Sequence, residues 1–120
     1  MSLLVYSPLS SGVLTGKYLS GKYPKGSRFD YNKRNDARYN PAHAQKAIQA
    51  YVDLAGEHDL DPAELALAFV NSREFVTGNI LGATSLAQLK VDIGSIDVEL
   101  SDDVLSEVER LHSQMPSPLT

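Results

Sequence analysis

The sequence contains no cysteine, so it carries no disulfide framework, no thiolate metal site and no cysteine nucleophile. Its apolar runs are too short for a transmembrane helix, and no signal-peptide pattern opens the chain. We therefore expect a cytoplasmic protein without a membrane partner. The length of 120 residues suits one domain, and the 42% hydrophobic and 22% charged residues are ordinary for a globular protein.

Positive charge is scarce outside one segment. The net charge is −4, yet residues 17–40 contain seven Lys or Arg and only two Asp. A basic segment on an acidic body indicates a local anionic partner, and a solvated loop without a ligand is the alternative. The tyrosines among these cations would suit stacking on nucleic-acid bases, but the acidic remainder of the chain would repel a phosphate backbone. We expect no nucleic-acid partner, and aromatic side chains that anchor the loop to the body.

Two short strands are predicted. An apolar, β-favouring run at residues 4–6 predicts the first, which ends at Ser7-Pro8 because proline cannot donate to a sheet. Residues 79–82 predict the second, which is apolar on both faces as in parallel sheets flanked by helices. Between them, residues 20–40 show no periodicity and predict a long irregular loop.

Capping residues predict the helices. The predicted starts are Asn40-Pro41, Asp61-Pro62 with Glu64, Ser85 with Gln88, and Ser101-Asp102-Asp103. Asn40 is the expected N-cap of a helix that ends near residue 57, and Pro41 is its expected first residue. Leu86, Leu89 and Ile93 are expected on the inner face of the third helix. The order strand, loop, helix, helix, strand, helix, helix predicts an α/β fold, although two strands alone do not make a stable sheet.

A loop follows each predicted strand. The first, residues 7–17, is rich in small and hydroxyl side chains and ends in Lys17, which suits an anion close to the backbone. It does not match a P-loop, because its glycine-to-lysine spacing is one residue short and a tyrosine follows the lysine. The second, residues 82–85, opens a helix whose free N–H groups and dipole attract anions. If the strands are parallel, both loops lie on one face and can hold one phosphorylated ligand. In the alternative interpretation, the glycines serve only turns, Ser85 and Gln88 only cap, and the cations are solvated.

Two motifs resemble a known family. Y-S-P-L-x-x-G-x-L-T-G-K-Y at residues 6–18 and I-L-G-A-T-x-x-x-Q-L at residues 80–89 resemble the C-terminal third of an aldo-keto reductase, in particular its Tas-like and potassium-channel β-subunit-like branches. The resemblance runs through essentially all 120 residues. It implies an α/β fold that is the C-terminal portion of a (β/α)8 TIM barrel, namely strands 7 and 8 with their helices. Residues 1–120 would then be a partial domain, mostly helical as an isolated fragment.

The resemblance also implies NADP(H) as cofactor and a set of binding residues. The stretch beside the nicotinamide and the pyrophosphate is matched by Tyr6, Ser7, Pro8, Leu9, Ser10, Ser11 and Gly12. The residues that close over the adenosine half are matched by Gly82, Thr84 and Gln88. Lys17 matches a basic residue near the phosphates, and Arg28 matches an arginine facing the 2′-phosphate, where a planar charged fork suits a dianion. Asp92 stands where the family commonly has asparagine; it can accept from the adenine amine, but its charge repels phosphate.

No catalytic residue is expected in this chain. In the family that it resembles, the catalytic Asp, Tyr, Lys and His precede the matched segment, and no residue here matches them. His43, His58 and His112 are expected to have no proton-transfer role, and no metal site is expected. The resemblance thus implies a chain that is inactive alone, with a carbonyl substrate bound only by the intact enzyme. The alternative is a non-catalytic module that binds a nucleotide or self-associates through exposed strands.

Overall fold

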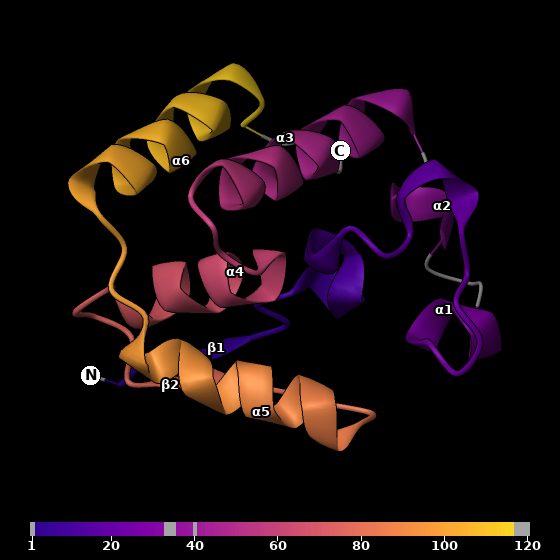
Figure 1. Cartoon of the computed structure of the whole chain (residues 1–120), viewed down its shortest axis with the longest axis horizontal. Coiled ribbons are helices and arrows are strands. Elements are labelled where there is room, and N and C mark those ends of the chain that lie inside the picture. The colour runs from indigo at the N-terminus through magenta and orange to yellow at the C-terminus, as the bar shows by residue number, and fades with distance from the viewer. Residues whose placement is uncertain (1, 33–35, 40, 117–120) are drawn as a thin grey trace.

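The computed structural model of the chain describes residues 2–32, 36–39 and 41–116. Helices make up most of it, and the strands lie along one side (Figure 1). In chain order the elements, with η for a 3-10 helix, are β1 (Leu4–Tyr6), η1 (Ser10–Thr15), η2 (Leu19–Gly21), α1 (Arg28–Tyr31), α2 (Asp36–Tyr39), α3 (Ala42–Glu57), α4 (Pro62–Asn71), β2 (Gly78–Ile80), α5 (Leu86–Gly94), η4 (Ser95–Asp97) and α6 (Asp102–Gln114). This order confirms the predicted alternation of strands with helices.

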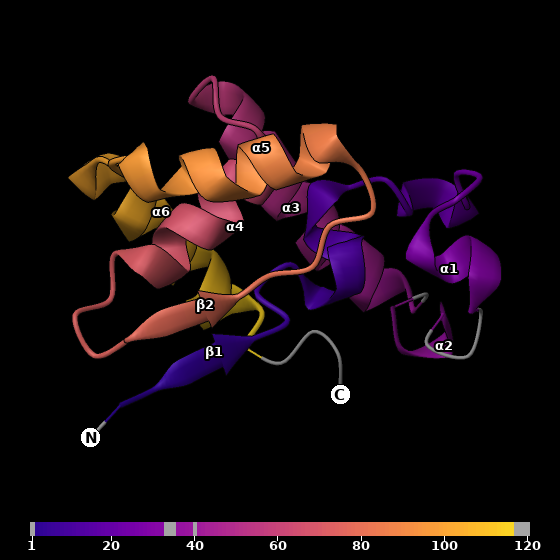
Figure 2. The ribbon, with the colours of Figure 1, turned by 90° about the horizontal axis from the view of Figure 1, so that it is seen from below.

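β1 and β2 form a parallel pair in which Tyr6 stands opposite Ile80. The prediction of β1 is confirmed, whereas β2 spans Gly78–Ile80 and not residues 79–82. β2 ends early because its partner ends: Ser7 turns the chain with φ 55°, and Pro8 has no N–H to donate. α5 runs along the β2 side of the pair (Figure 2), and α4 packs against β2.

The main core lies between α3, α4 and α6. Its buried members are Leu54, Ala55, Leu65, Val104, Val108 and Leu111. The capping box predicted for α4 is confirmed, since the Asp61 carboxylate accepts from the Ala63 N–H and the Glu64 carboxylate accepts from the Asp61 N–H. Ser101 caps α6 as predicted, because its hydroxyl accepts from the Val104 N–H at 3.3 Å. These caps fix where α4 and α6 begin and satisfy backbone N–H groups of their first turns.

α3 begins one residue later than predicted. Ala42 is its first residue, and Pro41 is the N-cap with an extended backbone (ψ 144°). The Pro41 carbonyl accepts the first intrahelical hydrogen bond, from the Gln45 N–H at 3.0 Å. Asn40, the predicted N-cap, lies outside the described residues. The end of α3 at Glu57 agrees with the prediction.

Aromatic side chains anchor the basic segment, as predicted for its tyrosines. Tyr18, Phe29 and Tyr39 are all buried, and their rings stack in sequence, with centroids 4.4 Å apart for Tyr18–Phe29 and 5.8 Å for Phe29–Tyr39. Tyr31 is an exception and stays exposed. The segment also contains η2, α1 and α2, which the sequence did not predict because single helical turns have no periodicity.

The predicted inner face of α5 is wrong. Leu86, Leu89 and Ile93 are 69%, 40% and 60% exposed. The face that α5 turns towards α4 carries Asp92, and Ser95 follows in η4; both are buried. The apolar stripe has no cover among the described residues, since the sheet beneath α5 is only two strands wide. Periodicity correctly predicted that Leu86, Leu89 and Ile93 share one face of α5, but it could not predict that this face is exposed.

Candidate functional site

The chain turns sharply after β1. Ser10, Ser11 and Gly12 have φ of 48°, 63° and 88°, all in the left-handed region. Two backbone hydrogen bonds of 2.9 Å hold the turn, from the Ser10 N–H to the Ser7 carbonyl and from the Gly12 N–H to the Leu9 carbonyl. A left-handed conformation costs a residue with a Cβ about 1–2 kcal/mol. Strained backbone of this kind clusters at functional sites, which makes η1 a candidate.

Lys17 folds back over Gly12. A Cβ on Gly12 would lie 2.9 Å from both Cε and Nζ of Lys17, so the ammonium occupies space that only glycine leaves open. Nζ also lies 5.2 Å from the centroid of the Tyr18 ring. No ion pair joins this ammonium to any residue that the structure describes. The turn therefore presents a held cation next to an accessible backbone.

Arg28 is tied indirectly to Lys17. The neighbours of these two cations in sequence, Tyr18 and Phe29, stack on each other, and the Tyr18 hydroxyl accepts from the Phe29 N–H at 3.4 Å. Arg28 is the first residue of α1, and its side chain is exposed. The aromatic contact thus fixes the backbone that carries both cations and leaves the guanidinium free to meet a ligand.

The start of α5 has both a cap and free donors. The Ser85 hydroxyl accepts from the Gln88 N–H at 3.2 Å, as predicted. The Gln88 side chain, however, accepts from the N–H and hydroxyl of Thr84, at 2.9 and 3.0 Å, and not from the N–H of Ser85. Leu86 and Ala87 lie in the first turn, where N–H groups have no intrahelical acceptor. Because this end is exposed and carries the positive end of the helix dipole, it suits an anion.

Parallel pairing brings the two loops together. Both strands run in one direction, so the turn after β1 and the loop after β2 leave from the same edge of the pair. Figures 1 and 2 agree that α5 begins on the side of the molecule that carries η1 and α1. The η1 turn and the start of α5 therefore lie on the same side of the molecule.

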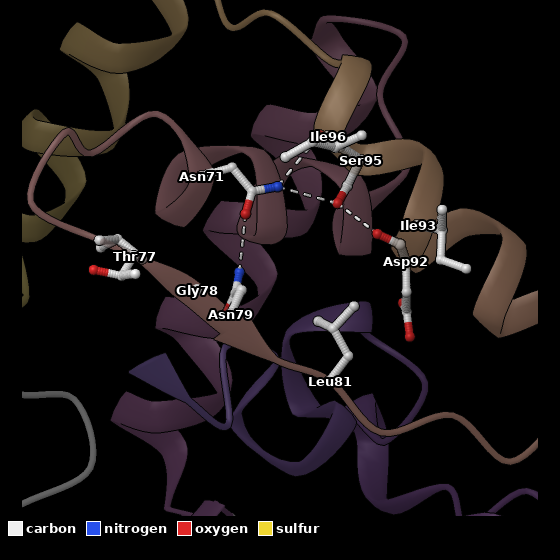
Figure 3. Close-up of a pocket in the computed structure, with 10 residues that line it drawn as sticks. Asn71, Thr77, Gly78, Asn79, Leu81, Asp92, Ile93, Ser95 and Ile96 are labelled. Atoms are coloured by element: carbon white, nitrogen blue, oxygen red, sulfur yellow. Dashed lines mark hydrogen bonds between the residues drawn. The ribbon is translucent and has the colours of Figure 1, made fainter. Parts of the chain in front are cut away.

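Asp92 is the buried acid of this region. It is only 5% exposed, and its carboxylate has no hydrogen bond or ion pair with any described residue. Burial raises the pKa of Asp92, the charge of Asp61 raises it further, and the charge of Lys17 lowers it. In Figure 3 the carboxylate points away from Ser95, on the opposite side from the backbone carbonyl that accepts the Ser95 hydroxyl.

A small polar network lies beside Asp92. The Asn71 amide donates to the carbonyl and hydroxyl of Ser95, and the Asn79 amide donates to the Asn71 side-chain oxygen at 3.3 Å. The side-chain oxygen of Asn79 is buried without a partner. With Asp92 and the aliphatic side chains around them, these residues line a cavity of about 330 Å³ (Figure 3). The sequence does not predict this network; the only signal for it is a pair of asparagines, Asn71 and Asn79, in otherwise apolar runs.

Comparison with known proteins decides the family. A sequence model described as the aldo/keto reductase family matches residues 1–113. The chain belongs to the aldo-keto reductase family. It is 49% identical over 118 residues to "Protein tas" of Escherichia coli (strain K12), which covers 98% of this chain and 34% of that protein.

Two further relatives are more distant. The chain is 33% identical over 120 residues to a "Probable voltage-gated potassium channel subunit beta" of Arabidopsis thaliana, which covers 97% of this chain and 37% of that protein. It is 29% identical over 123 residues to an "Aldo-keto reductase" of Babesia bovis, which covers 99% and 43%. The chain thus spans between about a third and two fifths of the length of these curated relatives. These matches confirm the predicted resemblance, including its branch.

The family fold is the TIM barrel, and a parallel strand pair with helices is consistent with a portion of one. Aldo-keto reductases generally use NADP(H). Of the predicted cofactor residues, Tyr6 ends β1 and is 78% exposed, and the stretch from Ser7 to Gly12 forms the turn. Thr84 and Gln88 are joined by hydrogen bonds, and Gly82 is exposed in open space. Arg28 stands apart on α1, tied to the rest through aromatic stacking.

The histidines are surface residues. His43, His58 and His112 are exposed. Among the described residues, no three His, Asp or Glu side chains are grouped to hold a metal ion. Across the same residues, no helix has the length and apolar character needed to cross a membrane.

Proposed function

We propose that this chain is the C-terminal, cofactor-binding segment of an NADP(H)-dependent aldo-keto reductase, and that β1 and β2 are strands 7 and 8 of its barrel. The observation that carries this proposal is the parallel pairing of β1 with β2, since it directs both loops to one edge. TIM-barrel enzymes place phosphate sites in the loops after strands 7 and 8. The matched family supplies the cofactor class.

The described residues fit a phosphorylated dinucleotide. Lys17 and Arg28 supply cations, and the first-turn N–H groups of α5 supply donors for phosphate oxygens. The turn from Ser7 to Gly12 has small side chains that let the nicotinamide half approach the backbone. Thr84 and Gln88, already joined by hydrogen bonds, close over the adenosine half.

Bound NADP(H) would supply a hydride for the reduction of a carbonyl substrate, or accept one in alcohol oxidation. This chain's own part is to bind and orient the cofactor. Nothing in it matches the family's proton donor, so we expect no turnover by the chain alone. The carbonyl substrate belongs to an intact enzyme in this proposal.

Titration of the purified chain tests the proposal. We expect NADPH to bind more tightly than NADH, because the 2′-phosphate adds a dianion for Arg28. Arg28→Ala should remove most of this preference, whereas Lys22→Ala, an exposed cation elsewhere in the basic segment, should leave it unchanged. Equal affinity for NADPH and NADH, or NADPH-dependent turnover by the chain alone, would contradict the proposal.

A second candidate function is supported by exposed apolar surface. Leu4, Ile80 and Ile96 are 60%, 53% and 69% exposed, and within the part of the chain that the structure describes each strand pairs along one edge only. An apolar groove of about 640 Å³ also runs between α4 and α6, where Phe69 and Val108 line it. Free strand edges and apolar patches favour association, so a module that self-associates through its strands is the alternative. Sedimentation that gives a monomer at every concentration would rule this candidate out.

A further inference from the structure

The apolar face of α5 has no partner in the part of the chain that the structure describes. Leu86, Leu89 and Ile93, here called the α5 stripe, share this face and are 69%, 40% and 60% exposed. Another face of α5 packs against α4, so the helix is held in place with its stripe turned outward. An exposed apolar stripe on a packed helix marks an interaction surface.

The apolar groove of about 640 Å³ between α4 and α6, here called the α4 groove, lies on the side of α4 away from α5. Ala66, Phe69 and Arg73 line it and recur at three- and four-residue spacing, so they share one face of α4. Asn71 is two residues from Phe69 and therefore lies on the opposite face, where it donates to Ser95 at the end of α5. The stripe and the groove thus flank α4 on opposite sides.

The strand pair has the same polarity. Among the described residues β1 and β2 each pair along one edge only, so their outer edges face opposite ways. α5 lies on the β2 side of the pair (Figure 2), and the α4 groove is lined by Pro8, which follows β1. Because parallel sheets are stable when helices cover them, each outer edge is one at which a further strand and helix can be added.

The groove suits an α5 stripe in shape and in charge. Leu86, Leu89 and Ile93 have the i, i+3, i+7 spacing of the anchors with which an amphipathic helix enters an apolar groove. Lys90 is exposed beside this stripe, and Glu109 lines the groove with a 62% exposed side chain. Docking the stripe would therefore bring a cation to a groove whose rim carries a carboxylate.

We propose that copies of this chain associate head to tail, with the α5 stripe of one copy in the α4 groove of the next. The outer edge of β2 then meets the outer edge of β1 in the next copy, and all strands stay parallel. Each copy supplies two strands and a TIM barrel has eight, so four copies close a ring. The inference rests on the second candidate function, to which it gives an interface, and it does not depend on a bound cofactor.

Two substitutions each disable one surface. Leu86→Glu places a charge on the stripe, and Phe75→Glu places one in the groove, which Phe75 lines while being 67% exposed. The matched control is Tyr31→Glu, because Tyr31 is 82% exposed on α1 and belongs to neither surface. Circular dichroism checks that each variant is folded, and sedimentation equilibrium gives its mass.

We expect the wild type and Tyr31→Glu to be tetramers. Leu86→Glu and Phe75→Glu should be monomers, with association weakened at least about 10-fold, because docking would bury an unpaired carboxylate. An equimolar mixture of these two variants should form dimers and nothing larger, since each pair has one intact stripe and one intact groove. Ile93→Glu and His112→Glu put the charge at a second exposed position on each surface and should give the same masses, which guards against a folding defect in one variant.

The outcomes distinguish this interface from the other proposals. A wild-type monomer would overturn both the interface and the second candidate function, whereas titration with NADPH tests the cofactor proposal separately. An assembly that persists in both stripe variants or in both groove variants would overturn the interface and leave self-association standing. A mixture that stays monomeric, a wild type with another number of copies, or loss of assembly in Tyr31→Glu would also overturn the proposal.

Discussion

The substitution Gly12→Ala tests whether the position of the Lys17 ammonium over the η1 turn matters for binding, apart from the backbone strain of the turn. Gly12 has φ 88°, where a residue with a Cβ costs about 1–2 kcal/mol, and alanine regains about 0.4–1 kcal/mol by restricting the unfolded chain. The new Cβ would lie 2.9 Å from Cε and Nζ of Lys17, the flexible end of that side chain, which can move aside at little cost. We therefore expect a net loss of about 1 kcal/mol in the free energy of unfolding.

Gly21→Ala is the matched control. Gly21 has φ 69°, and nothing lies within 4 Å of the Cβ that alanine would add there. Both variants should lose the same stability in urea unfolding, because both carry the same kind of backbone strain. Only Gly12→Ala displaces the Lys17 ammonium. A hydrogen bond to a charged group is worth about 1.5–3 kcal/mol, so this variant should weaken NADPH binding about 10- to 100-fold.

Binding measured by isothermal titration decides the question. Gly21→Ala should keep the wild-type affinity for NADPH, and Lys17→Met should match Gly12→Ala. Equal affinities in the two glycine variants would refute the reasoning, because the position of Lys17 would then not matter. A much larger loss of stability in Gly12→Ala than in Gly21→Ala would show that the lysine cannot move as assumed.

The remaining predictions concern stability. Gly16→Ala adds a Cβ 2.9 Å from Cγ2 of Val52, a packed side chain, so strain and overpacking together should cost about 2–4 kcal/mol in urea unfolding. Leu67→Ala empties a fully buried position and should cost about 2–5 kcal/mol, whereas a loss below 1 kcal/mol would mean that the core collapses around it. Asp61→Ala removes the α4 cap and should cost about 0.5–2 kcal/mol, which Asp61→Asn should largely restore. Folding raises the pKa of Asp92, so the folded state releases this proton at a higher pH than the unfolded state does, and the free energy of unfolding falls as pH rises above the unfolded pKa. Asp92→Asn should therefore gain stability over the wild type as pH rises from 4 to 7. Parallel pH profiles of the two proteins would refute this.

Local chemistry predicted much of this fold. The capping box at Asp61 and the cap at Ser101 depend on residues within four positions of each other, so the sequence contains all of their partners. The end of β1 could also be predicted locally, because Pro8 lies just beyond Tyr6 and has no N–H to donate to a sheet. The predicted end of β2 was wrong because β2 ends where β1, its partner far away in the sequence, ends. The predicted start of α3 was wrong by one residue, because a proline fits both the N-cap and the first helical position, and Pro41 is the N-cap.

The candidate site divides in the same way. The two loop motifs could be found from sequence, since small residues, a lysine and a helix start are visible in the order of amino acids. The network of Asn71, Asn79 and Ser95 could not, because these residues are up to 24 positions apart and meet only where α4, β2 and η4 pack. The sequence also could not predict that Leu86 is exposed, because periodicity shows which side chains share a helix face but not what that face packs against.

The order of amino acids was enough to establish the family, the helix caps, the strand that ends at Tyr6 and the basic segment, because each depends on neighbours in the chain. Folding in three dimensions was needed to set Lys17 over Gly12, to place Asp92 on the wall of the cavity and to turn the apolar stripe of α5 outward. The physical reason is that burial and electrostatic fields arise from groups far apart in sequence. They exist only after β1, α4 and α5 have packed.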